Sequence, residues 1–285
     1  MAEFVELYEV GPRDGLQNEK RVIPTVDKLA LIEKLSRCGF RRIEATSFVS
    51  PKWVPQMADA AEVMAKVPRR AGLSYAVLAP NLKGYEAAKL AGADEVAIFV
   101  SASEGFSRAN LNASTAESLE RLKPVAETAL GDRLRLRGYV SVVTDCPFDG
   151  KVEPLQVAKV AVELAALGCH EISLGETLGR GTPQAVAAML EAVLDVVPVQ
   201  KLAGHFHDTS GLALQNVDVA LEKGLRVFDA SVGGLGGCPY APGAAGNVAT
   251  EALARHLASN GFETGLDLSA LDEAAAFART LRSAA

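Results

Sequence analysis

Short apolar or β-branched runs alternate with helical patterns along the whole chain, and this alternation constrains the fold more than any other feature. Eight runs have the length and composition typical of strands: Val5–Val10, Arg42–Thr46, Leu73–Leu78, Glu95–Val100, Leu134–Val143, Glu171–Gly175, Leu202–His207 and Val227–Val232. Helical patterns lie between or after them: Val26–Cys38, Ser114–Ala129, Pro154–Leu167, Pro183–Val196, Ala213–Lys223 and Val248–Ser259. Such an alternation predicts βαβ units and a parallel sheet.

A glycine stands at five positions where a helix would end in an αL cap. These glycines are Gly39, Gly92, Gly168, Gly224 and Gly261. At the other end of the first helix, Thr25 is the predicted N-cap. Eight βα units in about 250 residues are typical of a (β/α)₈ TIM barrel, in which active sites form at the carboxyl ends of the strands.

An open, doubly wound sheet is the alternative fold. It would be expected to carry a Gly-x-Gly-x-x-Gly motif after an early strand, and the chain has no such motif. No Gly/Ser-rich linker or run of charges divides the sequence either. We therefore predict a single barrel domain over residues 1–285, with a glycine-rich active-site loop at 233–247.

Charge, hydropathy and cysteine spacing exclude several classes of protein. The net charge is −6, so there is no basic surface for nucleic acid. No apolar run approaches the ~20 residues of a membrane span, and without a signal or transit peptide the expected compartment is the cytoplasm. Cys38, Cys146 and Cys169 lie where packed small residues are expected, and no Cys-x-x-Cys pair suggests a zinc site or a disulfide scaffold.

Two of the four histidines, His205 and His207, lie at the end of a predicted strand. Side chains at i and i+2 of a strand point to the same face, so the two imidazoles converge. With Asp208 beside them, they are half of a metal site. The alternative interpretation is a pair of histidines that end the strand and bond to their neighbours.

Arg13 and Asp14 follow the first predicted strand, between Gly11 and Gly15. A surface turn is the alternative, because Pro, Asp and Gly are usual turn residues. The first and seventh strands of a barrel, however, deliver their ends to the same mouth. Asp14 and the two imidazoles would then give an N₂O ligand set that suits divalent metals.

Glu44 lies in the second predicted strand. A carboxylate directed into the barrel is costly unless it is paired, so its predicted partner is Arg13 or the metal. If Glu44 faced the helices instead, it would be an ordinary charge.

The stretch 233–247 follows the eighth predicted strand, and six of its fifteen residues are glycine. Such a loop can move and can bring backbone close to a ligand. It carries Cys238, for which a functional role is favoured because a structural cysteine would normally lie in a strand or helix. Asn247, at its end, is either the N-cap of the next helix or an oxygen ligand of the metal.

Four stretches resemble the hydroxymethylglutaryl-CoA lyase family. They are EVGPRDGLQNE (9–19), TSFVSPKWVPQ (46–56), HFHDT (205–209) and GLGGCPYAPGAAGNVATE (234–251). The likeness extends over essentially the whole chain. The Arg-Asp-Gly and His-x-His-Asp motifs are shared with a wider superfamily of metal-dependent barrels, which includes isopropylmalate-type synthases and pyruvate-handling aldolases. The Gly-Gly-Cys-Pro loop is the part specific to the lyases.

This resemblance implies a carbon–carbon lyase that cleaves 3-hydroxy-3-methylglutaryl-CoA to acetyl-CoA and acetoacetate, a reaction of leucine degradation and ketone-body formation. It implies that Mg²⁺ or Mn²⁺ is held by four residues: Asp14, His205, His207 and Asn247. Arg13 matches the family residue that stabilises the enolate, and Cys238 matches the family's acid/base cysteine. A homodimer is expected by the same analogy.

Glu44 is included among the expected catalytic groups, and further side chains are expected to contact an acyl-CoA substrate. These are Arg13, Gln17, Ser47, Lys20 and Asp208. For the CoA phosphates, the chain has no P-loop. It offers only loop-borne cations: Lys20, Lys52 and Arg108.

The chain departs from the family pattern at two places that bear on the choice of substrate. Glu176 stands where the family commonly has Asp, and Ser210-Gly211-Leu212 replaces a more usual Tyr-Gly-Gln. A lyase for a substrate with a longer C3 branch, such as an isohexenyl group, would use the same residues. Three further kinds of protein share parts of this pattern: a metal-dependent Claisen-condensing synthase, a metal hydrolase with His-x-His on its first strand, and a non-catalytic binding protein.

Overall fold

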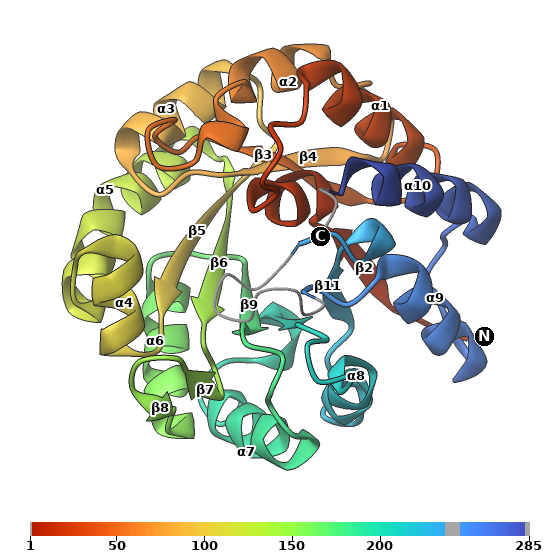
Figure 1. Cartoon of the computed structure of the whole chain (residues 1–285). Coiled ribbons are helices and arrows are strands. Elements are labelled where there is room, and N and C mark those ends of the chain that lie inside the picture. Colours follow the sequence, from red (N-terminus) through yellow and green to blue (C-terminus); the bar gives the residue numbers. More distant parts are fainter. Residues whose placement is uncertain (1, 237–245, 283–285) are drawn as a thin grey trace.

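The computed structural model describes residues 2–236 and 246–282, and the strands within these ranges close into a barrel with helices around it (Figure 1). All eight barrel strands pair in parallel. In their order around the barrel they are β10 (Leu202–Phe206), β11 (Val227–Ala230), β2 (Glu6–Glu9), β3 (Arg42–Ser47), β4 (Ser74–Leu78), β5 (Glu95–Ser101), β6 (Arg135–Ser141) and β9 (Glu171–Glu176). The eight predicted strands and the TIM-barrel fold are confirmed.

Ten α-helices are found in the described ranges, including all six that the sequence predicted. They are α1 (Thr25–Leu35), α2 (Ala60–Lys66), α3 (Leu82–Leu90), α4 (Glu104–Leu111), α5 (Thr115–Asp132), α6 (Pro154–Ala166), α7 (Pro183–Leu194), α8 (Ala213–Glu222), α9 (Thr250–Ser259) and α10 (Leu268–Leu281). The sequence prediction did not include α2, α3, α4 or α10. Proline occupies the first position of α6 and of α7, where its missing N–H costs nothing.

The ends of the helices follow the predicted pattern with one correction. Each predicted cap glycine has a positive φ: Gly39 (96°), Gly92 (74°), Gly168 (90°), Gly224 (94°) and Gly261 (81°). The prediction that Thr25 is an N-cap is wrong, because Thr25 is already helical and Pro24 precedes it. Its hydroxyl instead donates to Asp59 Oδ2 at the start of α2, over 2.8 Å.

Several short elements lie outside the barrel strands. The strands β1 (Glu3–Phe4) and β12 (Phe262–Glu263) pair with each other, as do β7 (Asp145–Cys146) and β8 (Gly150–Lys151). The 3₁₀ turns are η2 (Pro55–Met57), η3 (Val199–Lys201) and η4 (Val232–Gly234), and η1 (Gly11–Gly15) is a π-helical turn. Within the described ranges, no helix has both the length and the apolar composition needed to cross a membrane.

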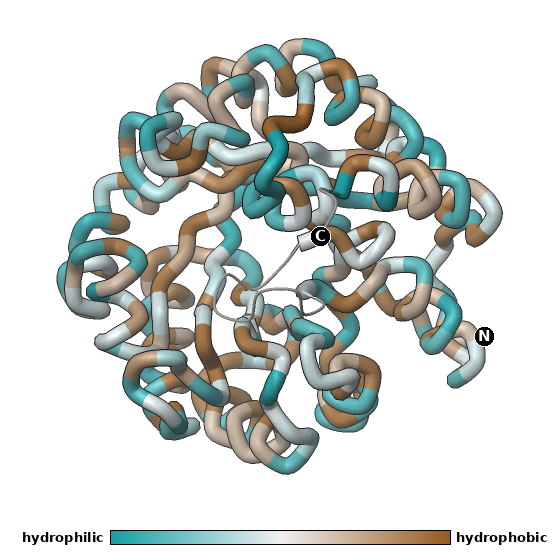
Figure 2. Tube along the Cα trace, viewed as in Figure 1, coloured by the Kyte–Doolittle hydropathy of each residue, from teal (hydrophilic) through white to brown (hydrophobic). Residues whose placement is uncertain are grey.

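The alternation of side chains along each strand separates an apolar layer from a polar interior. In β5, Val96, Ile98 and Val100 belong to the main hydrophobic core, whereas Ala97 and Phe99 belong to a small separate cluster with residues of β4 and β6. Figure 2 shows hydrophobic residues along the barrel strands and many hydrophilic residues on the outer turns of the helices. The barrel–helix layer therefore supplies most of the hydrophobic stabilisation.

The barrel interior contains a network of buried charges below the mouth. Arg42, at the start of β3, donates to both carboxylate oxygens of Glu171 over 3.0 Å. Glu171 also accepts from Arg137 Nε over 2.6 Å, and Arg137 donates onward to Asp229 on β11. Buried charges are stable only when they are paired in this way. The pairing fixes these strands relative to one another.

Candidate metal centre at the barrel mouth

Three side chains that the sequence predicted as metal ligands meet at the carboxyl ends of the strands. His205 belongs to β10, His207 follows the end of β10, and Asp14 belongs to η1, the turn after β2. One potential ligand atom from each side chain lies within 4.8 Å of the others. The two imidazole centroids are 5.3 Å apart. The group can therefore hold a single metal ion.

The turn η1 positions Asp14 because small residues let it approach its neighbours. The backbone N–H groups of Arg13, Asp14 and Gly15 all point to the carbonyl oxygen of Val10. A Cβ at Gly15 would lie 2.7 Å from Leu235 Cβ, so a larger residue would push η1 away from the chain that follows η4. The alternative prediction of a simple surface turn is wrong, because η1 is mostly buried and π-helical.

Asn247 lies beside this group. Its Nδ2 donates to Asp14 Oδ2 over 2.8 Å, and its backbone pairs with that of His207. The alternative prediction that Asn247 caps the next helix is wrong, since α9 begins at Thr250 with Ala249 at the N-cap. The four predicted ligands thus stand together, and they offer nitrogen and oxygen donors of the kind that divalent cations accept.

The electrostatic state of the group also fits a metal ion. Burial alone would raise the pKa of Asp14, but Arg13, His205 and His207 lower it to about 2. Burial, and then the neighbouring His205, lower the pKa of His207 to about 4. His207 Nδ1 is buried and has no hydrogen-bond partner among the described residues. A carboxylate and a neutral imidazole with an unpaired nitrogen are ready for coordination.

Arg13 is held beside the metal group by two carboxylates. Its Nη1 lies 2.6 Å from Asp14 Oδ1, and its Nε lies 2.6 Å from Glu44 Oε2. Glu44 is fully buried and also accepts from the hydroxyl of Tyr139 over 3.2 Å. Burial raises the pKa of Glu44, although Arg13 opposes this. The predicted orientation of Glu44, into the barrel and toward Arg13, is confirmed.

A cavity of about 260 Å³ is lined by residues of both kinds, charged and apolar. The charged or ligand-type residues are Arg13, Asp14, His205 and His207. The apolar side chains include Val49, Leu78, Phe99 and Phe106. A ligand in this cavity would therefore contact both charged and apolar groups.

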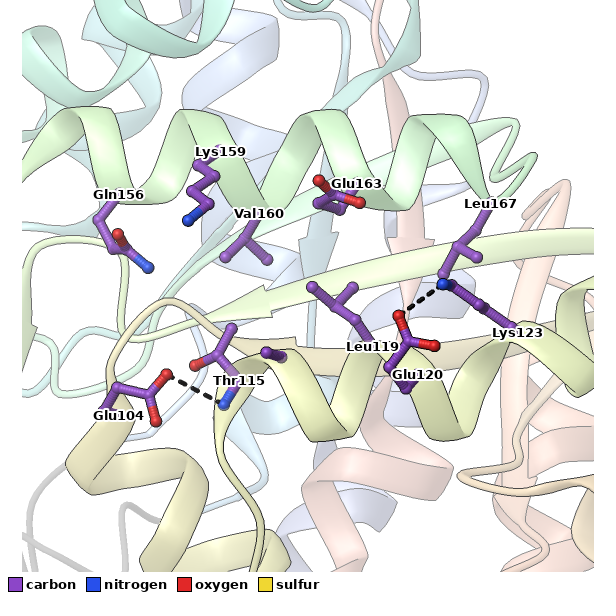
Figure 3. Close-up of a pocket in the computed structure, with 11 residues that line it drawn as sticks. Glu104, Thr115, Leu119, Glu120, Lys123, Gln156, Lys159, Val160, Glu163 and Leu167 are labelled. Atoms are coloured by element: carbon purple, nitrogen blue, oxygen red, sulfur yellow. Dashed lines mark hydrogen bonds and ion pairs between the residues drawn. The ribbon is translucent and has the colours of Figure 1, made fainter.

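A second cavity, between the outer helices α5 and α6, contains none of the predicted site residues (Figure 3). Its volume is about 230 Å³. Its charged side chains include Glu120 and Lys123, which pair with each other on the same helix, and Glu104, which accepts from the backbone of Thr115. This is an ordinary groove between neighbouring helices.

The remaining predicted substrate contacts occupy different positions. Gln17 lines the mouth cavity and donates to Asp14 Oδ1 over 3.2 Å. Ser47 is buried at the end of β3, and Lys20 is exposed after η1. Asp208 Oδ1 accepts from the N–H of Ala213, the first residue of α8, over 3.1 Å. Cys238 lies outside the described residues.

The other cysteines belong to the buried core, whereas Glu176, one of the departures from the family pattern, contacts the metal group through its backbone: its carbonyl oxygen accepts from the N–H of His207 over 3.2 Å. Cys38, Cys146 and Cys169 are buried, as the sequence predicted. Burial raises the pKa of Cys38 and of Cys169 to about 12. Glu176 accepts from the hydroxyl of Thr144 over 3.1 Å, so its carboxylate organises the neighbouring loops.

Three polar residues at the mouth were not singled out from the sequence. Tyr139 lines the cavity, and its ring lies beneath the Arg13 guanidinium at 5.5 Å. Glu9 accepts hydrogen bonds from the backbone of Gly11 and of Val232. Asp229 contacts His205. The available signal was an acidic or tyrosine residue inside an otherwise apolar strand, a position that is costly unless the group has a partner.

The chain is similar to a known protein family over most of its length. The family model described as HMGL-like matches residues 4–278. Over 270 residues, 95% of this chain and 90% of the relative, the chain is 56% identical to a 3-hydroxy-3-isohexenylglutaryl-CoA/hydroxy-methylglutaryl-CoA lyase of Pseudomonas aeruginosa.

Two solved structures are similar over nearly their whole length. The HMG-CoA lyase of Brucella melitensis has a TM-score of 0.98 and 64% identity, with 99% of each chain covered. An HMG-CoA lyase from Acinetobacter baumannii, in complex with coenzyme A and 3-methylmalate, has a TM-score of 0.92 and 40% identity, with 98% of this chain and 91% of that one covered.

Proposed function

Because this chain belongs to the HMGL-like family, we infer that it is a carbon–carbon lyase that cleaves 3-hydroxy-3-methylglutaryl-CoA to acetyl-CoA and acetoacetate. One observation in the molecule carries this inference. Asp14, His205 and His207 converge within 4.8 Å at a cavity that also contains Arg13. A metal hydrolase is disfavoured, because the histidine pair comes from the seventh strand of the barrel along the chain and not the first.

The four converging residues form the proposed metal site. Asp14, His205, His207 and Asn247 would hold a divalent cation, Mg²⁺ or Mn²⁺, which supplies the Lewis acidity that makes the tertiary C3 hydroxyl easier to deprotonate. The donor set supports a cation of this class, since it offers nitrogen and oxygen atoms and no thiolate.

The reaction breaks the C2–C3 bond of the substrate. The hydroxyl proton passes to the acid/base group, C3 becomes the ketone carbon of acetoacetate, and the bonding pair moves to C2 as a thioester enolate. Arg13 is the group proposed to stabilise the negative charge on the thioester oxygen. Glu44 and Asp14 hold its guanidinium in advance, so little reorganisation is needed when the charge develops.

The enolate must then be protonated at C2 to give acetyl-CoA. We propose that Cys238, within the glycine-rich segment 233–247, is the acid/base group for this step. The proposal is supported by the resemblance of that segment to the lyases. Of the other cysteines, the pKa of Cys38 and that of Cys169 are both raised by burial, which disfavours proton transfer by either thiol near neutral pH.

Gln17, Ser47, Lys20 and Asp208 stay proposed substrate contacts, and Gln17 has the strongest support because it lines the cavity. The CoA portion is supported by the coenzyme A complex of the Acinetobacter lyase. A homodimer is proposed by analogy with the family, and a cytoplasmic location is proposed because it is consistent with the bacterial relative from Pseudomonas.

A substrate with a longer C3 branch is a second candidate. The apolar side chains that line the cavity, which include Val49, Leu78, Phe99 and Phe106, could contact a hydrocarbon branch. The Pseudomonas relative is named for both an isohexenyl and a methyl substrate. The two substrates would share one metal site and one reaction.

The test is an assay of purified protein with 3-hydroxy-3-methylglutaryl-CoA and Mg²⁺ or Mn²⁺. We expect acetyl-CoA and acetoacetate in equal amounts. The isohexenyl analogue, measured in parallel, compares the two candidates by kcat/KM. If the folded, metal-bound protein cleaves neither substrate, the proposed function is wrong.

A further inference from the structure

The two histidines of the metal group have different surroundings. His205 Nδ1 lies 3.0 Å from Asp229 Oδ2, whereas His207 Nδ1 has no hydrogen-bond partner among the described residues. The contact with Asp229 follows from the sheet, because His205 on β10 is in register with Asp229 on the neighbouring strand β11. Of the two imidazoles, only that of His205 is therefore oriented by a carboxylate at its Nδ1.

The carboxylate of Asp229 has further hydrogen-bond partners besides His205. Arg137 donates to both of its oxygens, with Nη2 at 2.7 Å from Oδ1 and Nη1 at 3.2 Å from Oδ2. The hydroxyl of Ser173 donates to Oδ2 over 2.7 Å. Asp229 is 1% exposed. With the bond to His205, its carboxylate has four hydrogen-bond contacts, one at Oδ1 and three at Oδ2, and these fix its position.

Arg137 is equally constrained. Its guanidinium lies 4.1 Å from the ring centre of Tyr8 and 4.8 Å from that of Tyr139. Its Nε donates to Glu171 over 2.6 Å. An arginine clamped between two rings and two carboxylates cannot swing away from Asp229 without breaking several buried contacts. Arg137 therefore holds Asp229, the residue that contacts His205, in a fixed position.

We propose that Asp229 is a positioning residue that keeps the proton of His205 on Nδ1 and so directs the Nε2 lone pair into the metal centre. A neutral imidazole has one donor and one acceptor nitrogen, and an ionised carboxylate can only accept. The nitrogen that faces Asp229 must therefore carry the proton. This inference rests on the proposed function, in which His205 is a metal ligand.

Such support acts on both the geometry and the basicity of a ligand. A carboxylate behind a metal-binding histidine fixes the tautomer and the ring orientation, and its loss typically weakens metal binding roughly 10- to 100-fold. The competing explanation is that Asp229 serves only as the counter-ion of the buried Arg137. That explanation predicts no special effect on His205.

The first experiment measures the tautomer directly in the metal-free protein. The chain has four histidines, so the ¹⁵N resonances of the imidazoles can be resolved in a long-range ¹H–¹⁵N NMR spectrum. The variant His205→Asn identifies the signals of His205. We expect His205 to be protonated at Nδ1 and unprotonated at Nε2. The opposite tautomer in the wild-type protein would overturn the proposal, and this result requires no variant of Asp229.

The second experiment measures Mn²⁺ affinity by titration followed by electron paramagnetic resonance. We expect Asp229→Asn to raise the Kd for Mn²⁺ roughly 10- to 100-fold. The matched control is Glu171→Gln, which removes a buried carboxylate partner of the same Arg137 but does not touch His205. We expect its Kd to stay within about twofold of the wild type, the size of a minor effect.

An equal loss of affinity in both variants would show that the network acts only through stability, and would contradict the proposal. Wild-type affinity in Asp229→Asn would contradict it too. A wild-type protein that binds no Mn²⁺ but has the Nδ1–H tautomer would contradict the proposed metal site, while the tautomer prediction itself would hold. The two failures can therefore be distinguished.

Discussion

Arg13 illustrates how single residues at the mouth are fixed before substrate binds. Two carboxylates and the ring of Tyr139 hold its guanidinium, which is 6% exposed. The planar fork allows simultaneous contacts that the point charge of a lysine cannot reproduce. A group fixed in this way stabilises charge that develops in the transition state more than it binds the ground state.

Arg13→Lys is therefore expected to lower kcat by about 10²-fold or more, with a much smaller change in KM. Steady-state kinetics of acetoacetate release, with circular dichroism to verify the fold, measure this. Arg69→Lys, at an exposed arginine paired with Asp94, is the matched control and should keep wild-type kinetics. An effect of Arg13→Lys on KM alone would contradict the role proposed for Arg13.

Cys238→Ala tests the proposed acid/base group. Loss of general acid–base catalysis typically lowers turnover about 10²-fold or more, and Mn²⁺ affinity should barely change because the proposed ligands are other residues. Cys169→Ala, at a buried cysteine, is the control and should affect stability more than turnover. Full activity of Cys238→Ala would mean that another group supplies the proton.

The buried carboxyl of Glu9 makes the free energy of unfolding depend on pH. Burial raises its pKa from 4.5 to about 8, despite hydrogen bonds from Val232, Thr250 and Gly11. The folded state therefore binds more protons than the unfolded state between these two pH values. It follows that the free energy of unfolding decreases, through this group, as the pH rises from 4.5 toward 8.

Glu9→Gln should remove this contribution, because an amide can imitate the protonated carboxyl. Urea unfolding at pH 5.5 and 7.5 measures it in the metal-free protein. We expect the loss of stability between these pH values to be smaller in the variant by on the order of 2 kcal/mol. Glu62→Gln, at an exposed residue paired with Lys66, is the control. Identical pH dependence in Glu9→Gln and wild type would refute the assignment.

At the scale of elements, the helices of the outer layer begin and end where local chemistry requires. At the start of α5, Ser114 Oγ accepts from the N–H of Glu117 over 3.1 Å, and Glu117 Oε2 accepts from the N–H of Ser114 over 2.7 Å. This capping box satisfies two backbone donors that would otherwise lack partners. Because α5 packs outside the barrel, the motif contributes to stability and not to catalysis.

Ser114→Ala is expected to lower the free energy of unfolding by about 1 kcal/mol, the usual effect of losing an N-cap. Its kcat and KM should stay unchanged. Urea unfolding and the lyase assay measure the two quantities. Ser259→Ala is a suitable control, since that exposed hydroxyl donates to the carbonyl oxygen of His256 in the same turn and not to a neighbouring element within the described residues. A Ser114→Ala protein as stable as the wild type would show that the box contributes nothing.

At the scale of the whole molecule, closure of the barrel assembles the metal group from distant parts of the chain. Asp14, His207 and Asn247 come from opposite ends of the sequence and meet because β2 and β10 both flank β11. A metal ion bound only by this assembled group stabilises the folded state over the unfolded state. The gain is about 2.7 kcal/mol when the metal concentration is a hundred times Kd.

Addition of Mn²⁺ or Mg²⁺ should therefore raise the Tm, and chelation should reverse the rise and abolish lyase activity. Differential scanning calorimetry of metal-free and metal-loaded protein measures the shift. His207→Ala should lose the shift, whereas His256→Asn, at a histidine paired with Asp218 on the outer layer, should keep it. Equal shifts in both variants would place metal binding elsewhere.

The sequence by itself determined the features that depend on near neighbours along the chain. Strand runs, cap glycines and the shared direction of His205 and His207 follow from local backbone geometry, and they were sufficient to predict the barrel and the mouth. Predictions from local sequence were wrong where a distant residue offers a side chain another hydrogen-bond partner. Thr25 bonds to Asp59 rather than capping its own helix.

Only the tertiary structure decided which charged groups face one another. The contacts of Arg13 with Glu44, of His205 with Asp229 and of Asn247 with Asp14 join residues 31, 24 and 233 positions apart. Their distances depend on strand register and barrel closure, which no local pattern encodes. Burial then sets the charge state of each group, because the cost of an ionised side chain depends on the partners that the fold provides.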